Sequence, residues 1–359
     1  MKKPIYLFLW FWSLKLSSQD IHFSQFLNQP SLLNPALTGA IDPSRASIVY
    51  RDQWKSVSSP YVSYGISAET RFRAEESVHV STPGPKSSKK RSIGRSAVGV
   101  SIYKDKMGDG TISNTSTNLS LASSVSVNKM SHLGLGLQAS FTQTQLNNSG
   151  LIFPNQYNGR GYDESLNSGE SFQNQNFFHV DFAGGLVWVY NQSDKGLIGN
   201  RKLRGSFGLA FYHLNKSRSF LNNNPISGQT KYVIHGDLLT SLQNRDYAIR
   251  PFFLMQMKKP NTEVLAGFVI KRYMKLDSKY TGLVRRSSLN IGLSCRIGDA
   301  IIVNGGVDIK GKYTISFSYD INISKLKNGT NARGGFELSM SYIPAKTFFY
   351  RDKKITTSE

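Results

Sequence analysis

Apolar side chains recur at every second residue through most of this 359-residue chain, and no segment repeats them with a helical period. From Leu133 to Phe141, for example, the large apolar residues alternate with Gly, Gln and Ser. Successive side chains of a β-strand point to opposite faces. The alternation therefore predicts strands with one apolar face and one small, polar face.

The same pattern along the chain predicts about fourteen strands. They are expected near residues 46–53, 61–71, 96–104, 113–127, 131–144, 176–190, 203–214, 230–241, 246–257, 261–272, 286–297, 299–309, 312–323 and 333–343. Because no helical segment separates them, neighbouring strands should pair antiparallel.

The length of these segments bears on what they form. Several reach about ten residues, which suits a strand that crosses a bilayer at a tilt. A soluble β-sandwich shows the same alternation with its faces exchanged. The number and length of the strands, and the Gly and Ser on their polar faces, favour a membrane barrel. We therefore expect an all-β, antiparallel outer-membrane β-barrel of about 14 strands, with an N-terminal segment at its periplasmic end.

The N-terminus has the pattern of a secretory signal peptide. Two lysines precede a short apolar run at residues 5–12, and small residues follow, which predicts cleavage near Ser18–Gln19. We expect residues 1–18 to be the signal peptide and 19–45 a periplasmic or plug segment. The barrel should cover 46–343, with a basic loop at 73–94 and a long polar loop at 145–175. Residues 344–359 should form a charged C-terminal tail.

The composition argues against several other classes. The formal net charge is +21, but the basic residues are spread along the chain apart from a dense group at 86–95. A nucleic-acid module concentrates them on one element beside stacking aromatics, so we expect no nucleic-acid partner. Cys295 is the one cysteine and permits no internal disulfide. The six histidines have no zinc-ligand spacing, and no nucleophile–base motif occurs, so we expect no metal, cofactor or catalytic site.

Motifs near the N-terminus point to a family. They comprise Phe23, Gln25 and Phe26, then Asn34, Pro35, Ala36 and Gly39, then Tyr50, Arg51, Gln53 and Trp54. Singly, each has a structural interpretation, because Asn-Pro forms turns and Tyr and Trp lie at membrane interfaces. In this order they resemble the PorP/SprF family, membrane proteins of the type IX secretion system. The likeness continues at 101–111 and 318–343, whereas 145–245 matches only as a barrel and the tail departs from the family's ending.

The resemblance implies a non-enzymatic role in protein secretion and, in some members, gliding motility. It implies three partners: secreted cargo with a C-terminal sorting domain, periplasmic components of the secretion system, and outer-membrane lipid. The cargo would be exported or held at the cell surface. The residues expected to bind a partner or to plug the lumen are Phe23, Gln25, Phe26, Asn34, Pro35, Gly39, Gln53 and Trp54.

Two other kinds of barrel remain open. A fatty-acid-transporter-like barrel also has fourteen strands and an Asn-Pro-Ala element in an N-terminal hatch, and it would need an apolar pocket near that hatch. An open diffusion porin would need a lumen free of the N-terminal segment. The Ser, Gly, Gln and Asn on the expected inner face favour a protein partner or water.

Overall fold

The computed structural model describes residues 23–53, 61–72, 94–107, 112–128, 130–147, 151, 153–169, 176–192, 203–215, 230–242, 246–274, 287–324 and 327–344. The predicted signal peptide, Trp54, nearly all of the basic loop 73–94 and all but the first residue of the tail 344–359 lie outside these ranges.

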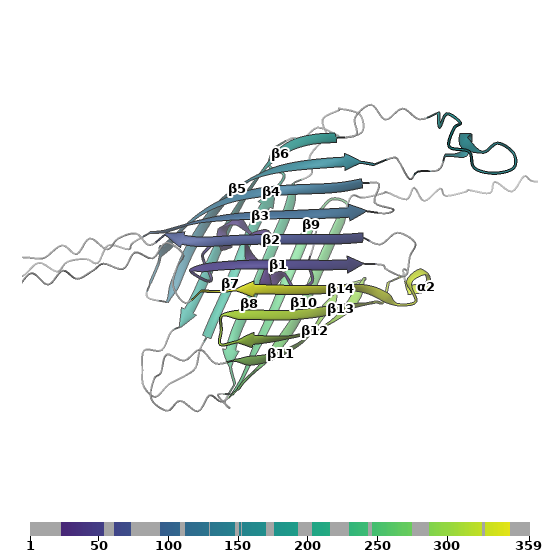
Figure 1. Cartoon of the computed structure of the whole chain (residues 1–359). Helices are drawn as coiled ribbons and strands as arrows, with labels where there is room; N and C mark the ends of the chain where they lie inside the picture. The colour runs from purple at the N-terminus through teal and green to yellow at the C-terminus, as the bar shows by residue number, and fades with distance from the viewer. Residues whose placement is uncertain are drawn as a thin grey trace, which may run out of the picture.

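Fourteen antiparallel strands form one closed barrel, which confirms the predicted fold (Figure 1). They are β1 (Ser44–Gln53), β2 (Tyr61–Phe72), β3 (Arg95–Met107), β4 (Ile112–Ser126), β5 (Ser131–Leu146), β6 (Asn176–Gln192), β7 (Leu203–Tyr212), β8 (Lys231–Ser241), β9 (Tyr247–Lys258), β10 (Asn261–Tyr273), β11 (Ser288–Arg296), β12 (Ala300–Ile309), β13 (Tyr313–Asn322) and β14 (Arg333–Tyr342). Each strand pairs with the next, and β14 pairs with β1 from Ala46↔Tyr342 to Gln53↔Gly335. The sheet therefore has no free edge between its first and last strands.

The described residues also contain five short helical turns. Three of them, η1 (Phe26–Asn28), α1 (Pro30–Leu33) and η2 (Pro35–Leu37), precede β1 and lie inside the barrel, where Figure 1 shows them in purple. The others are η3 (Pro154–Gln156), in the long polar loop, and α2 (Lys327–Thr330), between β13 and β14. No helix among the described residues is long and apolar enough to cross a membrane.

The two faces of the sheet follow the alternation of the sequence. Large apolar side chains such as Leu137 and Ile291, 60% and 70% exposed, cover the outside. Polar side chains such as Asn118 and Ser318, 1% and 0% exposed, face inward. This matches a barrel whose apolar band meets lipid, because hydrocarbon offers the outer face no hydrogen-bonding partner.

The two ends of the barrel are named proximal and distal. The proximal end is where β1 begins and β14 ends, and the distal end is opposite. Because the strands alternate in direction, odd-numbered strands run from proximal to distal and even-numbered strands return. The long loop between β5 and β6 lies at the distal end.

The single cysteine tests which face meets lipid. Cys295 is exposed on β11, with Leu293 and Ile291 on the same face. We expect a water-soluble maleimide to label it slowly in intact membranes and rapidly after denaturation. A matched variant, Cys295→Ser with Ser165→Cys in the exposed β5–β6 loop, should label rapidly in both states. Rapid labelling of Cys295 in intact membranes would show that this face meets water.

Candidate functional site

The N-terminal segment, residues 23–43, runs through the barrel and is called the plug below. Pro30 and Pro35 each occupy the first turn of a helix, α1 and η2, where a missing N–H costs nothing. Local bonds pair the backbone, such as Asn34 N to Pro30 O at 3.1 Å and Leu37 N to Asn34 O at 2.9 Å. The segment thus pairs part of its backbone locally and adds no strand to the sheet, in keeping with its prolines.

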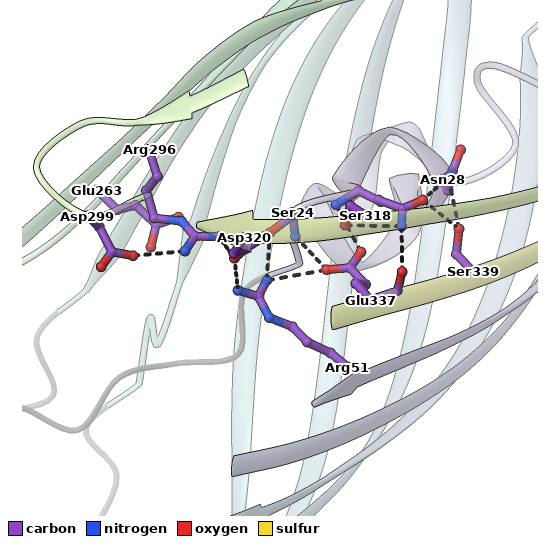
Figure 2. A network of polar contacts seen from close by, with 11 residues as sticks. Ser24, Asn28, Arg51, Glu263, Arg296, Asp299, Ser318, Asp320, Glu337 and Ser339 are labelled. Carbon is purple, nitrogen blue, oxygen red and sulfur yellow. Dashed lines mark hydrogen bonds and ion pairs between the residues drawn. The ribbon is translucent and has the colours of Figure 1, made fainter. Parts of the chain in front are cut away.

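Buried charges hold the start of the plug in the distal half (Figure 2). The backbone N–H groups of Ser24 and Gln25 donate to the two carboxylate oxygens of Glu337 on β14, at 2.8 and 2.9 Å. The guanidinium of Arg51 on β1 contacts Asp320 on β13 at 2.9 Å and Glu337 at 3.3 Å. The plug therefore extends from the proximal end into the distal half, deeper than a segment that only covers one opening.

A second arginine extends this cluster. Arg296 on β11 contacts Asp320 at 3.1 Å and Asp299 at 2.9 Å, and it donates to the hydroxyl of Ser24 at 2.8 Å. Ser24 donates in turn to Asp320 at 3.1 Å. The plug serine thus lies between two arginines and a carboxylate that come from three different strands. We call Ser24, Arg51, Arg296, Asp320 and Glu337 the distal cluster.

Amide groups continue the anchoring beside the distal cluster. The carboxamide oxygen of Gln25 accepts from Ser316 at 2.6 Å and Ser339 at 3.0 Å. Its nitrogen donates to the backbone carbonyl of Glu337 at 3.1 Å. Asn28 donates to Ser316 and Ser339, at 2.7 and 2.9 Å. The small hydroxyl side chains predicted for the inner face therefore serve as hydrogen-bonding partners of the plug.

Asn34 fixes the middle of the plug and is fully buried. Its side-chain oxygen accepts from Ala36 N at 2.9 Å, which caps η2. Its side-chain nitrogen donates to the carbonyls of Leu186 and Leu209, both at 3.1 Å, and lies 3.0 Å from a ring nitrogen of His235. The Asn-Pro-Ala motif is therefore a contact between the plug and strands β6, β7 and β8.

Glycines of the wall make room for this contact. A Cβ built on Gly185 would lie 1.9 Å from the side-chain oxygen of Asn34. A Cβ on Gly136 would lie 2.3 Å from the backbone nitrogen of Ala36, and one on Gly208 would lie 2.8 Å from the side-chain nitrogen of Asn34. Any other residue at these three positions would collide with the plug.

An apolar patch of the lumen receives the same part of the plug. Phe26 packs edge-on against Phe252 of β9, with ring centroids 5.4 Å apart. Leu33, Ala36 and Leu37 of the plug join a buried cluster with inward-facing wall residues. Those wall residues are Val187, Val189, Ala210, Val233, Phe252, Leu254, Leu265 and Ile302. Burial of one such side chain contributes about 1.5–3 kcal/mol, so this patch stabilises the plugged state.

The plug turns into β1 at the proximal end. Gly39 has φ +62°, a conformation that favours glycine, and its carbonyl accepts from Arg71 at 2.8 Å. Asp42 pairs with Arg45, and Arg204 on β7 lies 3.7 Å away. Burial alone would raise the pKa of Asp42, but the two arginines lower it to about 2. Asp42 is therefore ionised across the physiological range.

A side cavity of about 400 Å³ remains between the plug, strands β7 to β14 and the start of β1. Charged residues line it: Asp42, Arg45, Arg204, Asp237, Arg250, Lys271 and Asp308. Gly311, in the turn between β12 and β13, and Ile343, just after β14, also line it. Both lie at the proximal rim, so the cavity reaches the proximal end.

Seven of the eight residues predicted to form the site lie within the described part of the chain. Phe23, Gln25, Phe26, Asn34, Pro35 and Gly39 belong to the plug. Gln53 is a buried residue at the end of β1, and its carboxamide lies against the guanidinium of Arg51. Their role in binding a partner stays a prediction, as does that of Trp54. The sequence analysis placed Arg51 in a family motif but not among the site residues, and it did not identify Arg296, Asp320, Glu337 or the three wall glycines.

The described residues include no group of three or more His, Cys, Asp or Glu side chains placed to hold a metal ion. What the site offers is a buried set of hydrogen bonds and ion pairs between a plug and a barrel wall.

A family comparison identifies this architecture. The profile described as type IX secretion system membrane protein PorP/SprF matches residues 15–342. The chain belongs to this family. It is therefore an outer-membrane β-barrel of the type IX secretion system. No curated protein matches this PorP/SprF chain.

Solved structures similar to this PorP/SprF barrel are themselves barrels. CdiB from Acinetobacter baumannii matches with TM-score 0.41 and 8% identity over 84% of this chain, which spans 60% of that protein. The P. putida toluene transporter TodX matches with TM-score 0.41 and 10% identity, over 87% of this chain and 92% of TodX. A Pseudomonas aeruginosa FadL homologue gives 0.37 and 10%, over 86% and 92%. At such identities the likeness concerns the fold alone.

The crowding at Gly185 gives a test of the plug. We expect Gly185→Ala to displace the plug, because its Cβ would overlap Asn34, while the backbone ladder of the barrel stays intact. The measurement pairs single-channel conductance in planar bilayers, which should rise, with heat-modifiable gel mobility, which should persist. The control is Gly184→Ala, whose Cβ would meet its nearest atom at 3.8 Å. Equal conductance of the two variants would contradict the contact.

The distal cluster gives a second test. Arg51→Gln would remove the cation that contacts the buried Glu337 and one of the two that contact Asp320, and breaking a buried ion pair typically costs about 3–5 kcal/mol. We expect the heat-modifiable gel shift to occur at a clearly lower temperature. Arg95→Gln removes an equal charge from an exposed position on β3 and should leave that temperature unchanged. If the two variants melt alike, the cluster contributes nothing specific.

Proposed function

We propose that this barrel is a plugged, non-enzymatic component of type IX secretion that assists the export or surface attachment of cargo bearing a C-terminal sorting domain. The observation that supports it is the plug itself, which runs through the lumen and is held by buried ion pairs, amides and an apolar patch. A lumen occupied in this way is poorly suited to free diffusion of solutes. It is better suited to contact with proteins at its two ends.

The proposal includes an orientation. Outer-membrane barrels have short periplasmic turns and longer extracellular loops. The loop between β5 and β6 carries its own structure, including η3 and a bridge between Tyr157 and Tyr162, and it lies at the distal end. We infer that the distal end faces the cell exterior and the proximal end the periplasm. Cargo, such as gliding adhesins, would then meet the distal end, and periplasmic secretion components the proximal end.

The fatty-acid-transporter alternative requires an apolar pocket beside the plug. The side cavity instead has seven charged residues on its wall. Such a wall holds water and polar groups, because transfer of a small apolar solute there gains little. This favours a polar partner over a small apolar solute.

Removal of the plug tests the proposal. We expect deletion of residues 21–40, with the signal peptide retained, to leave an inserted barrel, because the β1–β14 ladder does not involve the plug. Surface labelling of secreted proteins that carry the sorting domain should nevertheless be lost. Heat-modifiable gel mobility of the barrel is measured in the same cells.

Deletion of residues 76–90 in the basic loop is the control of similar length, and we expect it to leave folding and cargo display unchanged. Normal cargo display from the plug deletion would remove the plug from the mechanism. Loss of the barrel itself would show that the plug is needed for assembly.

A further inference from the structure

The side cavity is built to receive hydrogen-bond acceptors, because its own carboxylates are already occupied. Asp308 accepts from Lys271 and Ser288, both at 2.9 Å, and from Thr314 at 2.7 Å. Each of these bonds takes up a lone pair of the carboxylate. Asp308 therefore has little capacity left for a ligand.

The other two carboxylates of the cavity are similarly engaged. Asp237 accepts from Ser206 on one oxygen and from two nitrogens of Arg250 on the other, at 2.8 and 2.7 Å. Asp42 is held by Arg45, with Arg204 nearby. A cation would thus find no open carboxylate on this wall.

The cations of the cavity, by contrast, keep unused donors. A lysine has three N–H donors and an arginine five. Lys271 directs one bond to Asp308, and Arg250 uses two nitrogens on Asp237. Arg204 donates through one nitrogen to the carbonyl of Ile41 at 2.9 Å. Arg45 also lies 4.0 Å from Glu69. The cavity wall therefore offers N–H donors on charged side chains that its own carboxylates leave unused.

The remaining lining suits a peptide backbone. The side chains of Asn290, Asn304, Ser316 and Ser341 offer both donors and acceptors, and Phe252 provides an apolar surface. The volume of about 400 Å³ lies within the range of ligand pockets, about 300–1,000 Å³. The cavity lining reaches the proximal rim at Gly311 and Ile343, which is the side from which an extended chain would enter.

We propose that the side cavity binds an extended peptide segment that carries carboxylates, entering from the proximal end and placing them against Arg204, Arg250 and Lys271. We assign this segment to another protein at the proximal end, because residues 345–359 of this chain carry four basic and only two acidic residues. The proposal does not depend on the role in secretion.

The test uses the purified full-length barrel in detergent and a fluorescent hexapeptide with two glutamates and a free C-terminus. Fluorescence anisotropy should show saturable binding that weakens as salt is added. A second probe, with glutamine for glutamate and an amidated C-terminus, should bind at least about tenfold more weakly, because charged hydrogen bonds contribute most of the affinity.

Variants locate the binding. Arg204→Gln and Lys271→Gln should each weaken binding of the acidic probe by about tenfold or more. Arg95→Gln removes the same charge at the proximal end of β3, outside the cavity lining, and should not. Asn304→Phe would fill the cavity and should abolish binding. Only variants with normal heat-modifiable gel mobility are compared, and the results for Arg204→Gln and Lys271→Gln are interpreted separately.

Truncation after Pro344 tests the chain's own tail as the occupant. Tighter binding of the probe after truncation, with competition by a peptide of residues 345–359 added in trans, would overturn the assignment to another protein. If truncation leaves the affinity unchanged, the natural ligand is another protein. Absence of saturable binding to both the full-length and the truncated barrel would overturn the proposal, as would equal binding by the cavity variants and Arg95→Gln.

Discussion

Backbone hydrogen bonds between β1 and β14 close the sheet, and the rest of the structure follows from that closure. Hydrocarbon offers no partner for an exposed N–H or C=O group, so a sheet can cross a membrane only without an edge. The register from Ala46↔Tyr342 to Gln53↔Gly335 meets this condition. A cylinder of fourteen strands then encloses a lumen too wide for its own short polar side chains to fill. The plug occupies that space, and it can do so without supplying a strand because its helical turns pair their own backbone groups.

The strands could be predicted from sequence because the alternation of faces is local. All but one of the strand boundaries fall within two residues of expectation, and two of the differences have identifiable causes. β3 continues to Met107, past the predicted residue 104, because Lys104, Asp105 and Lys106 interrupt the apolar pattern while still pairing with β4. β7 ends at Tyr212 instead of 214, because His213 leaves the strand conformation with φ +59°.

The plug was only partly predictable. Phe23, Gln25, Phe26, Asn34 and Gly39 were identified through their order along the chain, which resembles a family. The wall residues that contact them were not identified. Gln25 and Glu337, for example, are 312 positions apart in the sequence, and no local pattern joins them.

One signal in the sequence could have indicated which part of the barrel wall contacts the plug. Residues 186–190 of β6 are apolar on both faces, since Val187 and Val189 point inward while Leu186 and Trp188 point outward. A barrel strand facing only water in its lumen would not need inward valines.

The plug and the side cavity are physically coupled. Leu27, Asn28, Ile41 and Asp42 belong to the plug and also line the cavity, so a ligand there contacts plug and wall together. A ligand that binds the plugged arrangement more tightly stabilises it, and a ligand that binds better when the plug is displaced favours displacement. In each case the equilibrium shifts by the difference in binding free energy between the two arrangements. Displacement of the plug would also remove Ser24 from the distal cluster, where Arg51, Arg296 and Asp320 contact it. Because those groups are buried, their loss of partners opposes small movements of the plug. The buried contacts of the plug therefore hold it in place unless a bound ligand compensates for their loss.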